Sequence, residues 1–265
     1  MLDNNTQATA SVSFSQKCRG QFEEFKVLLN SIPAPTLTFF VLSVFSMNLM
    51  ANKSINLDLP WLALDCGIIV SWVASLTMDM MTKHFGPKAA TEISIYATAV
   101  NLVCCLFFFL MSLIPGTWGE SYVEGSELII GSALDNTFGG TWFIILGSTI
   151  AFTVSAFVNN FLNFSVGKVF KKNPDGLVAY LMRSYVSTFF AQFVDNFLFA
   201  FLVSRVFFGW TMTQCVTCSF FGMGVELLCE ALFSVFGYKV CVRWKKQGVG
   251  KAYFDYLKNK GEVCE

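Results

Sequence analysis

The chain of 265 residues is 54% hydrophobic and only 14% charged, whereas about a quarter of the residues of a soluble protein are charged. Eighteen Lys and Arg residues balance eighteen Asp and Glu residues, so there is no excess of positive charge to attract nucleic acid. The composition therefore excludes a water-soluble enzyme and a nucleic-acid-binding protein. It predicts an all-α integral membrane protein.

Residues 1–35 are expected to form a cytoplasmic N-terminal segment. They lack the basic and then apolar pattern of a cleaved signal peptide. Phe22, Phe25, Leu28 and Leu29 fit a short amphipathic helix at the inner membrane interface, and a solvated tail is the alternative.

Residues 36–240 are expected to form a transmembrane domain, because they contain six apolar stretches near the length of about 20 residues that crosses a bilayer. The expected spans begin near residue 36, cover 61–81 and 93–114, begin near 142, and cover 177–203 and 211–238. The second span would then contain Asp65, and Glu127 and Asp135 would lie in an acidic outer loop. Residues 241–265 are expected to form a basic tail.

The cationic residues predict the orientation of the bundle, because cytoplasmic loops collect Lys and Arg. With the N-terminus inside, the inner segments hold fifteen of the eighteen cations, and the outer segments hold only Lys53 and Arg205. Arg183 lies within a span. Both termini are therefore expected in the cytoplasm.

Several ionisable residues lie inside the predicted spans, although each costs about 2.5–3.5 kcal/mol at the centre of a membrane helix on insertion scales. These residues are Asp65, Asp79, Arg183, Asp195, Glu226 and Glu230. Asp65, Asp79 and Arg183 also fit positions near span ends, where they would reach the headgroups. Asp195 is the hardest to explain without a polar cavity.

Polar residues also recur at helical spacing in five of the six spans, which places them on single helix faces. The stripes are Asn48 and Asn52; Ser71, Ser75, Asp79 and Thr82; Ser148, Ser155, Asn159 and Asn163; Ser184, Thr188, Gln192 and Asp195; and Glu226 and Glu230. Lipid would leave these groups without hydrogen bonds, so the stripes are expected to face inward. Carboxylates, amides and nearby Phe rings would suit a planar small molecule that is rich in hydrogen-bond donors.

Three segments resemble the queuosine precursor transporter family, also called the vitamin uptake transporter family. Residues 76–88 resemble its "TDLLTEVYGKK" segment, residues 148–155 its "SLIAFLIS" segment, and residues 183–195 its "RNNVSTLISQLID" segment. The chain departs from the family pattern at Lys83, Ala156 and Asn159, and its sixth span carries Glu226 and Glu230 in place of a Lys and a "DTP"-like stretch.

The resemblance implies uptake of a 7-deazapurine base, such as queuine or a pre-queuosine base, across the bacterial inner membrane. It fits a site in which Asp195 or Glu226 accepts the donor edge of the base. Gln192 and Asn159 would meet its carbonyl and pyrrole positions, and Phe152 or Phe189 would stack on it. Asp79 and Glu230 are candidates for proton coupling, and Arg183 for pairing with a carboxylate or for gating.

A secondary transporter or facilitator is the favoured interpretation. The alternative is the substrate-binding subunit of an energy-coupling-factor importer, a related six-helix class that uses ATPase partners. An enzyme is not expected, because the chain has no GxxxxGK[ST], HExxH or GxSxG motif. Neither a cofactor nor a metal is expected, and a homo-oligomer is left open.

Overall fold

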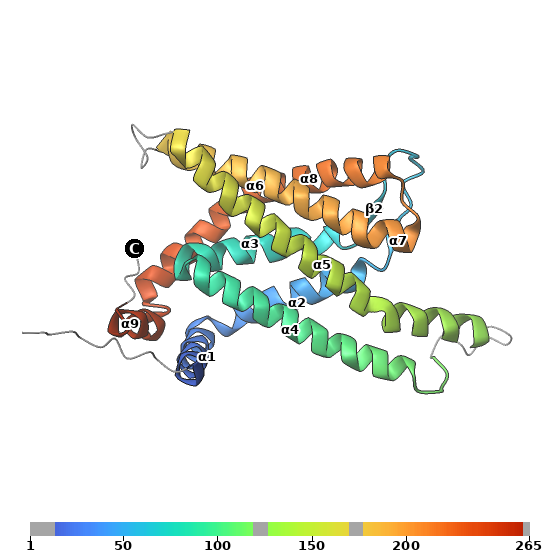
Figure 1. Ribbon diagram of the computed structural model, residues 1–265, viewed down its shortest axis with the longest axis horizontal. Helices are drawn as coiled ribbons and strands as arrows, with labels where there is room; N and C mark the ends of the chain where they lie inside the picture. Colours follow the sequence, from blue (N-terminus) through green and yellow to red (C-terminus); the bar gives the residue numbers. More distant parts are fainter. Residues whose placement is uncertain (1–13, 119–126, 170–176, 262–265) are drawn as a thin grey trace, which may run out of the picture.

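The computed structural model describes residues 14–118, 127–169 and 177–261. Apart from one small strand pair, their regular secondary structure is helical (Figure 1). The elements are α1 (Phe14–Ser31), α2 (Ala34–Met50), β1 (Ser54–Ile55), β2 (Leu64–Asp65), α3 (Ile68–Phe85), α4 (Pro87–Ser112), α5 (Glu127–Val169), α6 (Leu177–Phe199), the π-helical segment η2 (Ala200–Ser204), α7 (Arg205–Phe208), α8 (Met212–Gln247) and α9 (Lys251–Asn259).

Within the described residues, four helical segments are long and apolar enough to cross a membrane. They are Pro87–Ser112, Ile129–Asn159, Thr188–Phe208 and Met212–Phe233. A fifth span is counted if α1 and α2, which meet at 105°, are taken together. The expected all-α multi-pass membrane protein is therefore confirmed. The other expected spans coincide with α2, which has 17 residues, and α3, which carries Asp79 and Lys83.

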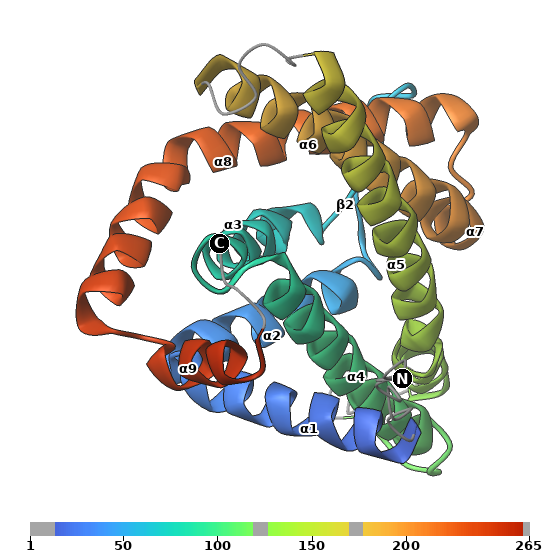
Figure 2. The same cartoon turned by 60° about the vertical axis from the view of Figure 1, so that its left-hand side comes forward.

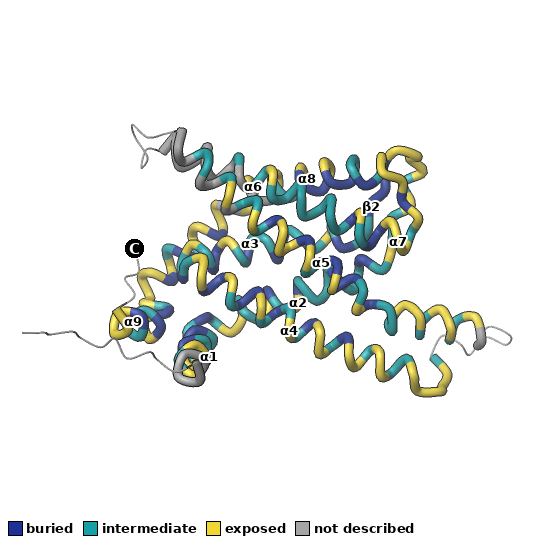
Figure 3. The backbone as a smooth tube through the Cα atoms, in the orientation of Figure 1, coloured by how far each residue is buried: buried dark blue, intermediate teal, exposed yellow. Residues whose placement is uncertain are grey.

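Figure 3 shows exposed positions in yellow along the outer helices, and many of these positions carry large apolar residues that form the lipid-facing surface. On α4 they include Ile95, Leu102, Leu106 and Phe109, which are spaced by seven, four and three residues and so share a helix face. Large apolar side chains at such a face are costly in water and favourable in a bilayer.

The second span begins later than expected, and Asp65 lies outside it. α3 begins at Ile68, and the preceding segment forms an antiparallel pair in which Ser54 is opposite Asp65. Asp65 Oδ1 accepts a hydrogen bond of 2.8 Å from the backbone N–H of Gly67, which turns the chain into α3. The predicted position of Asp65 within a span is wrong, because hydropathy does not distinguish a buried two-residue strand from the start of a helix.

Helix α5 is longer than expected. It begins at Glu127 rather than near residue 142, so its 43 residues extend about 65 Å at 1.5 Å per residue. Asp135, expected in a loop, lies in this helix and accepts a hydrogen bond of 3.1 Å from the indole N–H of Trp118. The ends of α4 and α5 together extend past the rest of the bundle (Figure 1).

We call the end of the bundle that carries β1, β2 and α7 the hairpin end. Here Ala51, Ile144 and Val203 form a buried apolar cluster. Gly147 of α5 lies so close to η2 that a Cβ at this position would be 2.2 Å from Val203 Cγ2. The absence of a side chain at Gly147 therefore allows α5 and η2 to pack closely.

We call the opposite end, where α1 and α9 lie side by side, the terminal end (Figures 1 and 2). Glu24 of α1 is 1% exposed, and its two carboxylate oxygens each lie 2.5 Å from a lysine Nζ, one from Lys88 of α4 and one from Lys260 after α9. Leu28 and Leu257 are buried in the same layer. The N-terminal helix and the C-terminal segment therefore pack together at the terminal end. Helix α8 continues through residue 247, so it extends past residue 241, where the tail was expected to begin.

Candidate functional site

A cavity of about 410 Å³ lies between the six long helices α2, α3, α4, α5, α6 and α8. Most of its polar lining comes from the predicted stripes, and α4 adds a further set. The polar lining residues are Asn48; Ser75, Asp79 and Thr82; Thr91, Ser94, Thr98 and Asn101; Ser148, Thr149, Ser155 and Asn159; Thr188, Gln192 and Asp195; and Glu226. No Lys, Arg or His of the described chain lines the cavity.

The structure brings together six of the nine predicted site residues. The six that line the cavity are Asp79, Phe152, Asn159, Gln192, Asp195 and Glu226. Phe189 is not among the lining residues, and its ring packs at 5.3 Å from that of Phe190. Arg183 and Glu230 lie on α6 and α8, but their side chains are outside the described part of the chain, as are those of Ser184 and Asn163.

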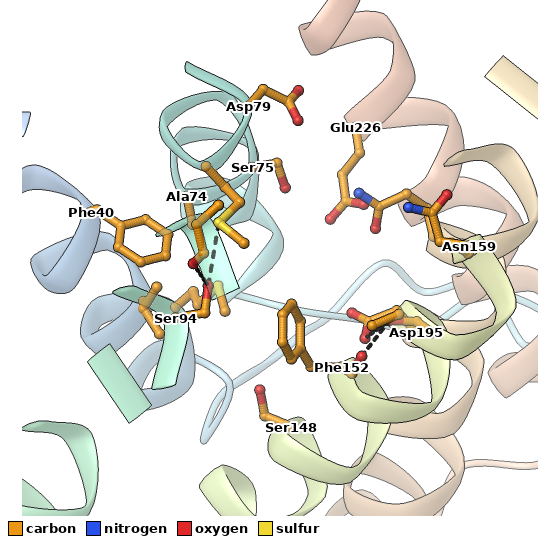
Figure 4. Close-up of a pocket in the computed structure, with 18 of the residues that line it drawn as sticks. Phe40, Ala74, Ser75, Asp79, Ser94, Ser148, Phe152, Asn159, Asp195 and Glu226 are labelled. Atoms are coloured by element: carbon orange, nitrogen blue, oxygen red, sulfur yellow. Dashed lines mark hydrogen bonds between the residues drawn. The ribbon is translucent and has the colours of Figure 1, made fainter. Parts of the chain in front are cut away.

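Asp195 is positioned by a contact between neighbouring helices. The hydroxyl of Ser155 on α5 donates a hydrogen bond of 3.1 Å to Asp195 Oδ1 on α6 (Figure 4). The carboxylate keeps further acceptor positions beyond this one bond, because each ionised carboxyl group has about four lone-pair sites. Asp195 can therefore accept hydrogen bonds from a ligand while Ser155 holds its orientation.

Phe152 projects from α5 into the cavity, between Ser94 on one wall and Asp195 on the other (Figure 4). It is 43% exposed, which leaves much of the ring uncovered by protein. Asn159 lies about two turns further along α5, opposite Glu226 of α8 (Figure 4). The side-chain oxygen of Asn159 is buried and has no hydrogen-bond partner among the described residues. The cavity thus combines an aromatic face with carboxylate and amide acceptors.

The polar residues of α4 were missed by the sequence analysis, which treated this helix only as the span without charge. Ser94, Thr98 and Asn101 are spaced by four and three residues, so the same rule that identified the other stripes also applies here. All three line the cavity. Asn101 is 1% exposed, and its side-chain oxygen has no hydrogen-bond partner within the described chain.

A smaller cavity of about 80 Å³ lies next to the first, toward the hairpin end. Met47, Asn48, Ser148 and Asp195 line both cavities, and Asp65 lines only the smaller one. The shared residues therefore mark the deep end of the main cavity. At the other end the lining residues Asp79, Pro87 and Thr91, which lie on either side of the turn between α3 and α4, are exposed.

Comparison with protein families gives one match. A family model described as "Putative vitamin uptake transporter" matches residues 65–240, which include all the lining residues except those of α2. Neither the comparison with curated proteins nor that with solved structures found a match.

Proposed function

Because the chain belongs to the vitamin uptake transporter family, we propose that it takes up a queuosine precursor across the bacterial inner membrane. The proposed substrate is a 7-deazapurine base such as queuine or a pre-queuosine base. The observation that carries this proposal is the position of Asp195 in a polar cavity between the membrane helices, held by Ser155 and opposite an aromatic ring.

The chemistry of a 7-deazaguanine matches these groups. Its ring N–H and exocyclic amino group are adjacent donors, which one carboxylate accepts together. We assign this role to Asp195, with Glu226 as the second candidate, and assign Gln192 and Asn159 to the carbonyl and pyrrole positions. Phe152, rather than Phe189, would stack on the base, because only Phe152 of the two lines the cavity.

The proposed topology has six crossings and two cytoplasmic termini. The contact between α1 and α9 supports an even number of crossings between them. The terminal end carries Lys88 and Lys260, and its remaining exposed cations on α8 and α9 include Lys245, Lys246 and Lys251. This excess of positive charge supports a cytoplasmic position for that end.

The proposed mechanism is secondary transport with alternating access around the cavity. The cavity reaches toward the terminal end of α3 and α4, whereas Val203 and Gly147 pack tightly at the hairpin end. With the terminal end in the cytoplasm, as proposed, this arrangement supports an inward-facing state. Asp79 lies at the exposed end and remains the candidate for proton coupling, together with Glu230, and Arg183 remains the candidate for gating.

Uptake of labelled 7-deazaguanines into salvage-deficient cells tests the proposal. The Asp195→Asn, Gln192→Ala double variant should lose at least tenfold in initial uptake rate at equal membrane abundance, since both substitutions remove groups that face the base. Asp135→Asn is the matched control, because it makes the same change in a helical Asp outside the cavity. Unchanged uptake by the double variant would contradict the assigned site.

The second candidate function is the substrate-binding subunit of an energy-coupling-factor importer. It would need a docking face of small residues on α2, where Ser43 is buried and Met47 lines the cavity. Transport by the purified protein alone in liposomes would exclude this alternative. Co-purification with ATPase subunits, together with ATP-dependent uptake, would favour it.

A further inference from the structure

The cavity wall formed by α4 is polar from Thr91 to Asn101, although the proposed base-binding groups lie on α5, α6 and α8. Thr91, Ser94, Thr98 and Asn101 line the cavity from this helix. Thr91 and Asn101 are ten positions apart, which corresponds to about 15 Å along the helix axis. The cavity is therefore much longer than a fused bicyclic base, and it has room for a second group of the ligand.

Two hydroxyls of α4 can act toward a ligand only as acceptors, because the single hydrogen of each is already donated. The hydroxyl of Ser94 donates to Ala90 O at 3.0 Å, and that of Thr98 donates to Ser94 O at 3.0 Å. On the neighbouring helix α2, Asn48 Nδ2 uses one of its two hydrogens to donate to Val44 O at 2.9 Å. The lone pairs of the two hydroxyls and the amide oxygen of Asn48 remain available for a ligand.

Asn101 adds an acceptor that the described protein does not satisfy. It is 1% exposed and lines the cavity, and its Oδ1 has no hydrogen-bond partner among the described residues. A buried acceptor without a donor is unfavourable, so its presence at a cavity wall indicates a ligand that supplies the donor.

We infer that Ser94, Thr98, Asn101 and Asn48, the acceptor wall, bind the substituent at position 7 of the base. The wall selects substituents that end in a hydrogen-bond donor, such as an amine or a hydroxyl group, because the oxygens of all four side chains can accept from them. A nitrile has only an acceptor, which the amide N–H groups of Asn48 and Asn101 alone could meet. Phe152 stands between Ser94 of the acceptor wall and Asp195 (Figure 4), so a base held by Asp195 would reach the wall with a substituent that passes the edge of the ring. This inference rests on the proposed function, because it assumes that a 7-deazaguanine occupies the cavity.

Binding of two matched ligands to the purified full-length protein tests the inference. The ligands are 7-aminomethyl-7-deazaguanine and 7-cyano-7-deazaguanine, which share the base and differ in the terminal group. The unmodified protein should bind the aminomethyl compound at least fivefold more tightly. Equal affinities, or tighter binding of the cyano compound, would overturn the inference and leave the proposed function intact.

The variant Asn101→Leu should lose at least fivefold in affinity for the aminomethyl compound and keep its affinity for the cyano compound. Cys105→Ala is the control, because Cys105 is buried one turn further along α4 and does not line the cavity. An equal loss for both ligands would assign Asn101 to packing and overturn its role in selection. If neither base binds to the unmodified protein, the proposed function itself fails.

Discussion

The hydroxyl of Ser155 on α5 and the carboxylate of Asp195 on α6 are joined by a hydrogen bond of 3.1 Å at the wall of the central cavity. The bond connects the two helices that pack most extensively against each other in the described bundle. It also leaves Asp195 between the main cavity and the smaller cavity toward the hairpin end. The orientation of the proposed base-binding carboxylate therefore depends on a neighbouring helix.

Replacing Ser155 with Ala should weaken binding of a 7-deazaguanine by about three- to tenfold, because Asp195 loses the donor that orients it. The free energy of unfolding should fall by about 1 kcal/mol, the typical value of such a bond between membrane helices. Ligand-dependent thermal shift of the purified protein measures both effects. Thr153→Val removes a hydroxyl from the exposed face of α5 and should leave binding unchanged. A binding loss of the same size in both variants would contradict the role of Ser155.

Replacing Phe152 with Ala should weaken binding of the base by about tenfold, since stacking of an aromatic pair contributes about 0.5–1.5 kcal/mol beyond its buried area. Equilibrium binding of a labelled base to protein in detergent measures the change. Phe157→Ala is the matched control, because Phe157 lies on the same helix, is 71% exposed and does not line the cavity. Full affinity of the Phe152 variant would mean that its ring does not stack on the ligand.

Replacing Gly147 with Ala should lower the free energy of unfolding by about 1–3 kcal/mol, as overpacking of a close contact usually does. The new methyl group would lie 2.2 Å from Val203 Cγ2 unless α5 and η2 move apart. Thermal unfolding in detergent measures this effect. Gly140→Ala lies on the same helix and has nothing within 4 Å of the added Cβ, so it should not destabilise the protein. The close packing of α5 on η2 would be refuted if the two variants had equal stability.

The contribution of Glu24 to stability should depend on pH. Burial by itself raises the pKa of this carboxyl group, but hydrogen bonds from Lys260 and Lys88 outweigh that effect, and the pKa is lowered from its ordinary value of 4.5. Because the unfolded chain then binds a proton more readily than the folded one, this stabilisation is complete above about pH 4.5 and is lost as the pH falls below it.

The variant Glu24→Gln should therefore be less stable than the unmodified protein at pH 7, by about 1–2 kcal/mol, because both lysines are partly exposed to solvent. Melting temperatures in detergent between pH 3.5 and pH 7 measure the difference. The two proteins should converge as the pH falls. A difference that is constant over this range would show that the ion pairs of Glu24 do not stabilise the terminal end.

The sequence by itself determined the class of the protein and most of the polar groups that meet inside it. Apolar stretches of span length and polar residues at intervals of three and four are local patterns, and lipid forces such polar faces inward. For this reason the sequence alone identifies Asp195, Gln192 and Asn159 as inward-facing polar residues. The helical spacing of Ser94, Thr98 and Asn101 carries the same information, although this span contains no charged residue between positions 93 and 114.

Only the tertiary structure decided which groups face one another. Three features depend on contacts between distant segments. They are the strand pair that places Asp65 outside the second span, the extension of α5 to Glu127, and the position of Phe152 rather than Phe189 in the cavity. Glu24 likewise reaches Lys260 across 236 positions of the chain. Such pairings follow from the packing of whole helices, and no periodicity within a single segment specifies them.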